Sequence, residues 1–209
     1  GQKELILHHN ILKNNERTDR CSDIMARWDW CEGIKVYNCE FYKPEIQATT
    51  TLWNFAIETW NIEGGVEIFD NIFNGGYSVI DIGGGGDTAK NVKGNYAFSV
   101  KAYRNQFIRN TLLDASIGQN YAFYVEAVNQ CSDVYMFDNY MYNIACAFAV
   151  GSGDTRANYK NRIYFYRNLA VNLAWQQDWT MPIVRIRNTK GSASVYDSIF
   201  ILNNTFVGV

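Results

Sequence analysis

The sequence predicts an all-β solenoid, in which about seven coils of parallel strands stack on one another. Three observations predict it. One pattern of residues occurs seven times along the chain, apolar residues alternate within each copy, and charges of opposite sign recur at the same position in successive copies. Self-similarity at a period of about 30 residues is typical of solenoids, whose repeats pack only against their neighbours. Residues one repeat apart in sequence should therefore be neighbours in space.

Each copy of the repeat is centred on an asparagine, with one exception. The central position is occupied in turn by Asn10, Cys39, Asn71, Asn105, Asn139, Asn168 and Asn204, at intervals of 29, 32, 34, 34, 29 and 36 residues. A side-chain amide can bond to its own and neighbouring backbone groups, so we expect this column at a turn. Cys39, the exception, is expected to pack at the same turn.

Apolar residues define the inward side of each copy. They stand five and three positions before the centre and two positions after it, as Val66, Ile68 and Phe73 do around Asn71. The first two columns have a period of two and favour β-branched residues, which predicts a strand with these side chains in the core. The third column should also stack in the core.

The outward positions test the alignment, because stacked side chains must tolerate one another. Four positions before the centre the chain reads Lys35, Glu67 and Lys101, and one position before it Asp70, Arg104, Asp138 and Arg167. Stacking in register would make ladders of ion pairs, each worth roughly 0.2–1 kcal/mol. Two positions before the centre stands a mostly aromatic column: His8, Tyr37, Phe69, Tyr103, Phe137, Tyr166 and Leu202.

A second strand should precede each of these strands after the first. The predicted segments are Asp23–Trp28, Asn54–Trp60, Ser78–Ile82, Ala122–Val128, Ala147–Val150 and Pro182–Arg187. A third strand after the asparagine turn has a less clear pattern. The connections vary in length, and variable loops are where a solenoid places its insertions.

The repeat resembles that of right-handed parallel β-helix proteins of the pectin-lyase-like class. The segments VEIFDNIF and SIFILNNTF show the resemblance most clearly, and the repeat covers nearly the whole chain. The resemblance implies a right-handed parallel β-helix and a polysaccharide lyase or glycoside hydrolase. Enzymes of this class often use lysine or arginine with calcium. Fold alone does not assign a function.

Composition fits a single folded domain over residues 1–209. The chain is 47% hydrophobic and 19% charged, and its net charge of −2 gives no footprint for nucleic acid. No apolar run is long enough to span a membrane. Strand patterns lie close to both ends without a capping helix. We therefore expect uncapped ends, and either a segment of a longer β-helix or an end-to-end contact with another β-helix segment or chain.

The five cysteines and two histidines give no metal motif. A disulfide between Cys21 and Cys31, or between Cys131 and Cys146, is one reading of the cysteines, and reduced buried thiols are the other. His8 and His9 are adjacent along a predicted strand, so their side chains should point to opposite faces and not share a metal.

The outward face of the second strands is the candidate site. The alignment stacks Arg27, Glu58, Asp81, Glu126, a small residue near Gly151, and Arg185 on successive coils. Carboxylates at a strand spacing of roughly 4.8 Å, or twice that, suit a general acid and a general base of glycoside cleavage. Tryptophans near these positions, above all Trp30 and Trp60, suit sugar rings, which have apolar faces.

The sequence favours a secreted or cell-surface protein that hydrolyses or eliminates a polysaccharide in this groove. Glu58, Asp81 and Glu126 are the candidate catalytic residues, with Trp30 and Trp60 as sugar platforms and Arg27 and Arg185 as anion contacts. No cofactor is indicated, although the acidic row could hold calcium through oxygen ligands. The alternative is a non-catalytic structural or adhesive segment, such as a stalk, a surface module or a tailspike-like module. A cleft lined by the carboxylates and tryptophans would favour the enzyme.

Overall fold

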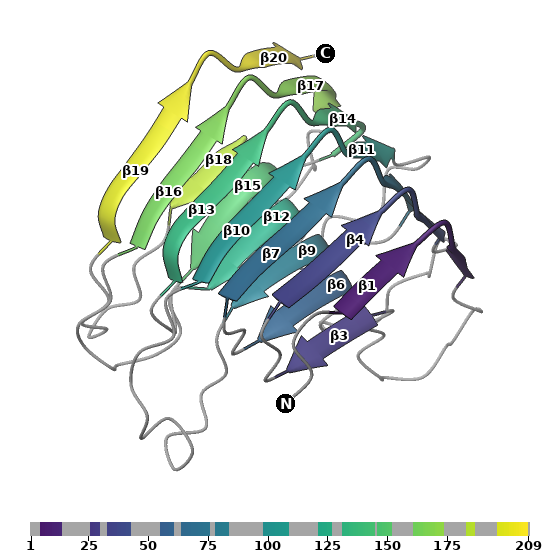
Figure 1. Cartoon of the computed structure of the whole chain (residues 1–209). Coiled ribbons are helices and arrows are strands. Elements are labelled where there is room, and N and C mark those ends of the chain that lie inside the picture. The colour runs from purple at the N-terminus through teal and green to yellow at the C-terminus, as the bar shows by residue number, and fades with distance from the viewer. Residues whose placement is uncertain are drawn as a thin grey trace, which may run out of the picture.

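The computed structural model describes residues 5–13, 26–29, 33–42, 55–60, 64–75, 78–83, 98–108, 121–126, 131–144, 146–151, 161–173, 183–186 and 196–208. These residues form twenty strands and no helix. All the strands pair in parallel, in three sheets that we name A, B and C (Figure 1). The predicted all-β solenoid is confirmed.

Each sheet takes one strand from each coil. Sheet A contains β1 (Leu5–His8), β4 (Gly33–Tyr37), β7 (Gly64–Phe69), β10 (Phe98–Tyr103), β13 (Cys131–Phe137), β16 (Asn161–Tyr166) and β19 (Tyr196–Leu202). Sheet B contains β2 (Ile11–Lys13), β5 (Glu40–Tyr42), β8 (Ile72–Asn74), β11 (Gln106–Ile108), β14 (Tyr140–Tyr142), β17 (Leu169–Leu173) and β20 (Thr205–Gly208). Sheet C contains β3 (Ala26–Asp29), β6 (Phe55–Trp60), β9 (Ser78–Gly83), β12 (Tyr121–Glu126), β15 (Cys146–Gly151) and β18 (Val184–Ile186).

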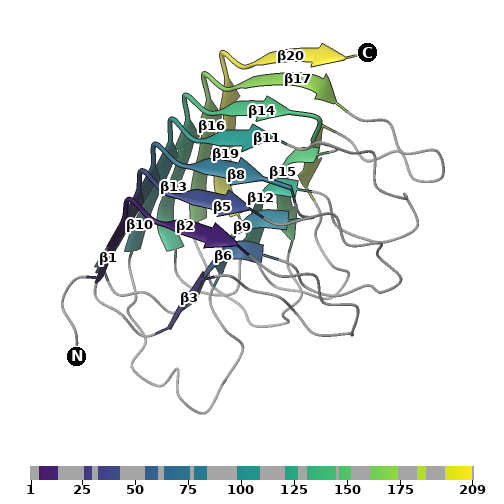
Figure 2. The same ribbon diagram turned by 90° about the vertical axis from the view of Figure 1, so that its right-hand side faces the viewer.

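The chain passes through the three sheets in turn, so that strands three apart in sequence are neighbours in space. Sheets A and B meet at a sharp bend, sheet C faces sheet A, and the coils wind in a right-handed sense with the two termini at opposite ends of the stack (Figures 1 and 2). This is a parallel β-helix of seven coils. Sheet B contains the third strand of each coil, whose pattern in the sequence is weak.

The strand register confirms the sequence alignment of the repeat. Val66 is paired with Ile34 on one side and Val100 on the other. These inward columns are fully buried in the middle coils, and Phe41, Phe73 and Phe107 stack behind them with ring centroids 4.9 and 5.0 Å apart. Burial of these columns between the three sheets removes apolar surface from water in every coil, which is the main stabilising contribution.

The bend between sheets A and B is made by one left-handed residue per coil. His9, Asn38, Asp70, Arg104, Asp138, Arg167 and Asn203 all have φ between 52° and 55°. Side chains other than those of asparagine and aspartate rarely adopt this conformation. This left-handed conformation turns the chain from sheet A to sheet B at the same place in every coil.

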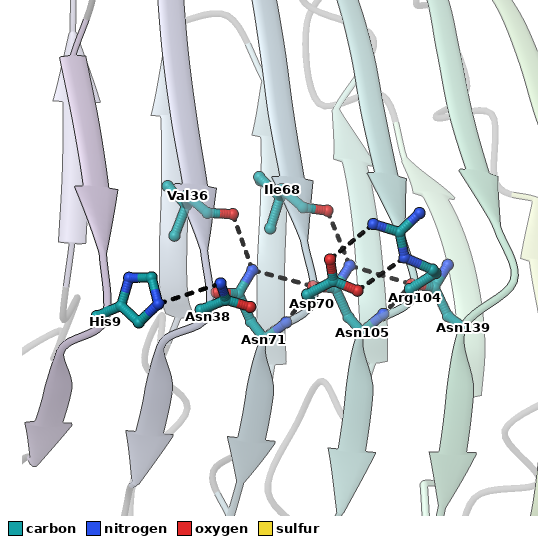
Figure 3. Close-up of polar contacts among 9 residues, drawn as sticks. All are labelled: His9, Val36, Asn38, Ile68, Asp70, Asn71, Arg104, Asn105 and Asn139. Carbon is teal, nitrogen blue, oxygen red and sulfur yellow. Dashed lines mark hydrogen bonds and ion pairs between the residues drawn. The ribbon is translucent and has the colours of Figure 1, made fainter.

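The residue after the bend is the central residue of the repeat, and the asparagines there in the middle coils, Asn71, Asn105, Asn139 and Asn168, are buried and bond to the next coil. Asn105 Oδ1 accepts hydrogen bonds from the backbone N and the Nδ2 of Asn71, at 3.2 and 3.0 Å. Asn105 Nδ2 donates to Ile68 O and to Asn139 Oδ1, at 2.9 and 3.1 Å (Figure 3). The pattern continues to Asn168 and Asn204, so the predicted turn column is an asparagine ladder.

Cys39 ends this ladder on the side of the first coil. Its backbone N donates to Asn71 Oδ1 at 3.0 Å, and its Sγ donates to Leu7 O at 3.7 Å. A thiol has no amide group with which to continue the chain of side-chain bonds. Cys39 and Cys146 are both buried free thiols, so the predicted disulfide alternative between Cys131 and Cys146 is wrong. The alternative pair Cys21 and Cys31 lies outside the described residues.

The outward charged residues at the bend lie in one column, and neighbouring residues of the column form separate ion pairs. Arg104 donates to both carboxylate oxygens of Asp70 at 2.7 and 2.6 Å, and Arg167 does the same to Asp138 at 2.8 and 2.6 Å. Glu67 is in register between Lys35 and Lys101, as predicted. The sequence alignment missed a third bidentate pair, Arg162 with Asp133, at 2.7 and 2.9 Å.

The aromatic column of sheet A is a continuous stack. Neighbouring rings from His8 through Tyr37, Phe69, Tyr103 and Phe137 to Tyr166 have centroids 4.9–5.2 Å apart and planes within 4–9° of parallel. Because the faces of these rings cover one another, this column offers ring edges rather than open faces to solvent. A second stack joins Tyr135, Tyr164 and Phe200.

The outermost strands of the described stack have one neighbour each. They are β1, β2 and β3 at one end and β18, β19 and β20 at the other. Ile201 lies in an inward column and is 41% exposed, whereas Ile68 in the same column is fully buried. A contact with another β-helix segment at these edges remains a prediction. In the part of the chain that the structure describes, no helix has the length and apolarity to cross a membrane.

Candidate functional site on sheet C

Two acidic residues meet on the outward face of sheet C. Strand β6 contains Glu58 and strand β9 contains Asp81, and these residues are direct partners in the register of the two strands. Arg27 of β3 is the partner of Glu58 on the other side. The first half of the predicted file of charges is therefore confirmed as a file of backbone positions.

The predicted place of Glu126 is wrong. The partner of Asp81 on β12 is Tyr124, and the file continues through Ala149 to Arg185. Glu126 lies two residues farther along β12, opposite Gly151. A shift of two residues keeps the alternation of inward and outward side chains, so the hydrophobic pattern could not reveal it. The arrangement has two neighbouring carboxylates, not three.

The carboxylates are buried, contrary to the open groove that the sequence suggested. Glu58 is 4% exposed and Asp81 is 1% exposed. Their inward-facing neighbours Ile57, Ile80 and Ile82 are buried as well, so these strands are shielded from water on both faces. Glu58 and Asp81 therefore neither line an open cleft nor form a solvated acidic row.

One oxygen of each carboxylate is buried and accepts no hydrogen bond. Glu58 Oε2 and Asp81 Oδ1 are the buried side-chain oxygens of the described residues that accept no hydrogen bond. Both residues have further interactions, so neither carboxylate as a whole lacks a partner. These two oxygens are therefore buried in the protein.

The far half of the same face has a polar and aromatic cluster that sequence reasoning missed. Arg185 Nη1 donates a hydrogen bond of 2.8 Å to Tyr121 Oη, and the ring of Tyr121 stacks on that of Tyr124 at 5.4 Å. Cys146 packs beside them, and burial raises the pKa of its thiol to about 12. Cys146 is therefore protonated at neutral pH and is not a nucleophile. The two tyrosines of β12, at positions 121 and 124, were the available signal.

The remaining predicted site residues are Arg27, Trp60 and Trp30. Arg27 lies on β3 and is the register partner of Glu58. Trp60 lies on β6 and is the register partner of Asp29 and of Gly83. For these two residues and for Glu126 the structure describes the strand position alone. Trp30 lies outside the described residues. In the described ranges no group of three or more His, Cys, Asp or Glu residues is arranged to hold a metal.

The chemistry open to this site is proton transfer. Glu58 and Asp81 are adjacent at the roughly 4.8 Å strand spacing of a sheet, which brings two carboxyl groups to the same small volume. On sheet A, the ion pairs Arg104–Asp70, Arg162–Asp133 and Arg167–Asp138 join stacked charges of opposite sign. On sheet C, Glu58 has a residue of like charge in register on one side, Asp81, and Arg27 on the other.

Comparison of the chain with models of known protein families, with curated proteins and with solved structures found no match. The resemblance to the pectin-lyase-like class rests on the repeat and on the coil architecture.

Proposed function

We propose that this protein acts on a polysaccharide, by hydrolysis or β-elimination, at the outward face of sheet C. The observation that supports the proposal best is that two acidic residues, Glu58 and Asp81, are register partners on neighbouring strands. Because the substrate would lie outside cells, the proposal also implies a secreted or cell-surface protein.

Two neighbouring buried acids have an energetic cost. Moving a carboxylate out of water is unfavourable, and two neighbouring carboxylates add mutual repulsion. The same chain stacks opposite charges on sheet A, where Asp70, Asp138 and Asp133 each face an arginine. Functional sites are where a protein is expected to depart from the rules that stabilise the rest of its fold. Like charges in register, in a solenoid that stacks opposite charges elsewhere, are such a departure.

In this proposal Glu58 and Asp81 divide the roles of general acid and general base. One protonates the leaving oxygen, and the other takes a proton from water or from the sugar carbon beside a uronate group. Arg27, in register beside Glu58, would neutralise an anionic sugar. Arg185 would do the same from the far end of the file, and Trp30 and Trp60 would support sugar rings. Glu126 would contribute from outside the file, and calcium is a further candidate for neutralisation.

The test is a panel of neutral and uronate-containing polysaccharides, assayed for new reducing ends and for the absorbance of unsaturated uronate. Glu58→Gln and Asp81→Asn should each lower the rate by at least about 100-fold, since general acid–base catalysis contributes roughly 10²–10⁴-fold. Asp133→Asn, which removes a partly exposed carboxylate from sheet A, is the matched control and should keep full activity.

The second candidate is a structural or adhesive β-helix segment without catalysis. The burial of both acids favours it, because a substrate must reach Glu58 and Asp81. This candidate predicts no product from any polysaccharide, with Glu58→Gln and Asp81→Asn behaving as the parent does. That result would overturn the catalytic proposal.

A further inference from the structure

The first bend brings together both histidines of the chain. His8 Nδ1 and His9 Nδ1 are 2.8 Å apart, and the ring planes are nearly perpendicular, at 89°. The sequence predicted opposite faces for these side chains, and that prediction is wrong. His9 has φ 54° and so leaves the alternation of the strand, which turns its side chain toward that of His8.

Neighbouring groups hold both rings in place. His8 stacks on Tyr37 with centroids 5.2 Å apart and planes 9° from parallel, and His9 meets the edge of the same tyrosine at 6.0 Å. The amide Nδ2 of Asn38 lies 3.4 Å from His9 Nε2 (Figure 3). Both histidines are exposed, so a solute can reach the two Nδ1 atoms.

We propose that His8 and His9 bind one borderline divalent transition-metal ion through their Nδ1 atoms, with water completing the coordination. Imidazole nitrogens lie about 2.0–2.1 Å from such a metal, so two of them in adjacent coordination positions are separated by about 2.9–3.4 Å. The observed 2.8 Å needs a shift of a few tenths of an ångström. Metal binding replaces the hydrogen bond between the two Nδ1 atoms, and the histidine that carries its proton on Nδ1 changes to the tautomer protonated on Nε2, with no net loss of a proton from the neutral rings.

The surroundings of the pair bear on this role. A histidine that ligates through Nδ1 carries its proton on Nε2 and donates it to an outer acceptor, so the Asn38 side chain would turn its amide oxygen to His9 Nε2, where its Nδ2 now lies. Nitrogen ligands prefer Cu²⁺, Ni²⁺ and Zn²⁺ over the oxygen-seeking Ca²⁺ and Mg²⁺. The site is on the first bend of sheet A and does not depend on the function proposed for sheet C.

The chain itself supplies conservative substitutions for the test. Phenylalanine occupies the His8 column at Phe69 and Phe137, so His8→Phe keeps the aromatic stack. Asparagine occupies the His9 column at Asn38 and Asn203, both left-handed, so His9→Asn keeps the bend. Both variants should therefore unfold at the same denaturant concentration as the parent when metal is absent.

The experiment is a calorimetric titration of the full, tag-free chain with Ni²⁺, alongside proton NMR of the histidine rings. The chain has only two histidines, so their ring signals report this site alone. We expect one Ni²⁺ per chain, paramagnetic broadening of both rings, and affinity that falls on acidification as imidazole protonates. Each single variant should bind Ni²⁺ at least about tenfold more weakly. Only one imidazole ligand remains in it, so the gain in affinity from a second ligand held nearby at high effective concentration is lost. Excess Mg²⁺ should not compete.

Two results would overturn the proposal. One is the absence of Ni²⁺ binding near neutral pH. The other is equal binding by the parent and the double variant His8→Phe/His9→Asn, which would place the ion on other groups, such as the cysteines. Unchanged denaturation midpoints exclude loss of folding as the reason for weaker binding.

Discussion

At the scale of single residues, Asn105 shows how this fold uses polar groups. Its side chain is fully buried, and four hydrogen bonds join it to the coils on both sides. A buried amide without these partners would be costly, so its bonds specify which residues of successive coils stand opposite one another. The sequence predicted a turn role from the repeat of asparagine. It could not show that the amides bond to one another, because that depends on the spacing of the coils.

Replacing Asn105 with alanine should lower the free energy of unfolding by about 2–5 kcal/mol, since buried partners on Asn71, Ile68 and Asn139 would lose their bonds. Gln106→Ala, at the exposed neighbouring position, should change it by less than about 0.5 kcal/mol. Chemical denaturation followed by circular dichroism measures both. Equal, small effects would show that the ladder contributes little to stability.

Asp70 gives a pH-dependent prediction. Its hydrogen bonds from Arg104 hold the pKa of the carboxyl below its ordinary value of 3.8. Such a group stabilises the folded state fully above the ordinary pKa, and this contribution is lost as the pH falls through the lowered pKa of the folded state. Asp70→Asn removes it and keeps a residue that the left-handed bend accepts, as Asn38 and Asn203 show.

The parent should therefore be more stable than Asp70→Asn near neutral pH, and the difference should shrink toward about pH 2. Other carboxylates titrate in both proteins and cancel in the comparison. Denaturation midpoints measured across this range at low salt test the expectation. A difference that does not vary with pH would mean that the ion pair does not stabilise the fold.

At the scale of strands, side chains that are in register form continuous columns across sheet A. Tyr103 of β10 stacks between Phe69 of β7 and Phe137 of β13, with centroids 5.1 and 4.9 Å away. Parallel strands one coil apart impose this spacing, and flat rings fill it face to face. The aromatic column in the sequence predicted the file. The parallel orientation of its rings follows from the strand spacing.

Tyr103→Ala should reduce stability by about 1–3 kcal/mol, because two ring contacts of about 0.5–1.5 kcal/mol each are lost. Tyr103→Phe keeps both contacts and should be within about 0.5 kcal/mol of the parent. Thermal and chemical denaturation of the three proteins compare these values. A Tyr103→Phe variant as unstable as Tyr103→Ala would assign the effect to the hydroxyl and not to the stack.

Strand register also marks where sequence reasoning failed. Sheet A follows a strong repeat, and the sequence predicted its register correctly, as the pairing of Lys101 with Glu67 shows. The strands of sheet C follow connections of variable length, so the alignment there had no fixed reference, and Glu126 was placed two residues from its true position. Burial of Glu58 and Asp81 was missed for a related reason. A strand pattern tells inward from outward and cannot tell whether the outward face is covered.

At the scale of the whole molecule, the repeat determines the architecture. Apolar columns give the core, the asparagine ladder and left-handed bends give the corner between sheets A and B, and paired charges face solvent. These features agree with one another, as expected for a sequence that specifies one fold. The function is less visible, because it depends on a few positions on one face. Glu58 and Asp81 could be nominated from sequence, whereas the tyrosine cluster and the histidine pair required the structure.

The central claim is that residues one repeat apart lie side by side, and disulfide cross-linking tests it most directly. Lys101 is the register partner of Glu67, at a spacing of roughly 4.8 Å that a disulfide can bridge. Ser99 stands two residues earlier on β10, at roughly 8 Å from Glu67, which is too far. Peptide mapping after mild oxidation should find the new disulfide in Glu67→Cys/Lys101→Cys and not in Glu67→Cys/Ser99→Cys. Equal yields in the two variants, or a disulfide in the second alone, would contradict the coil register.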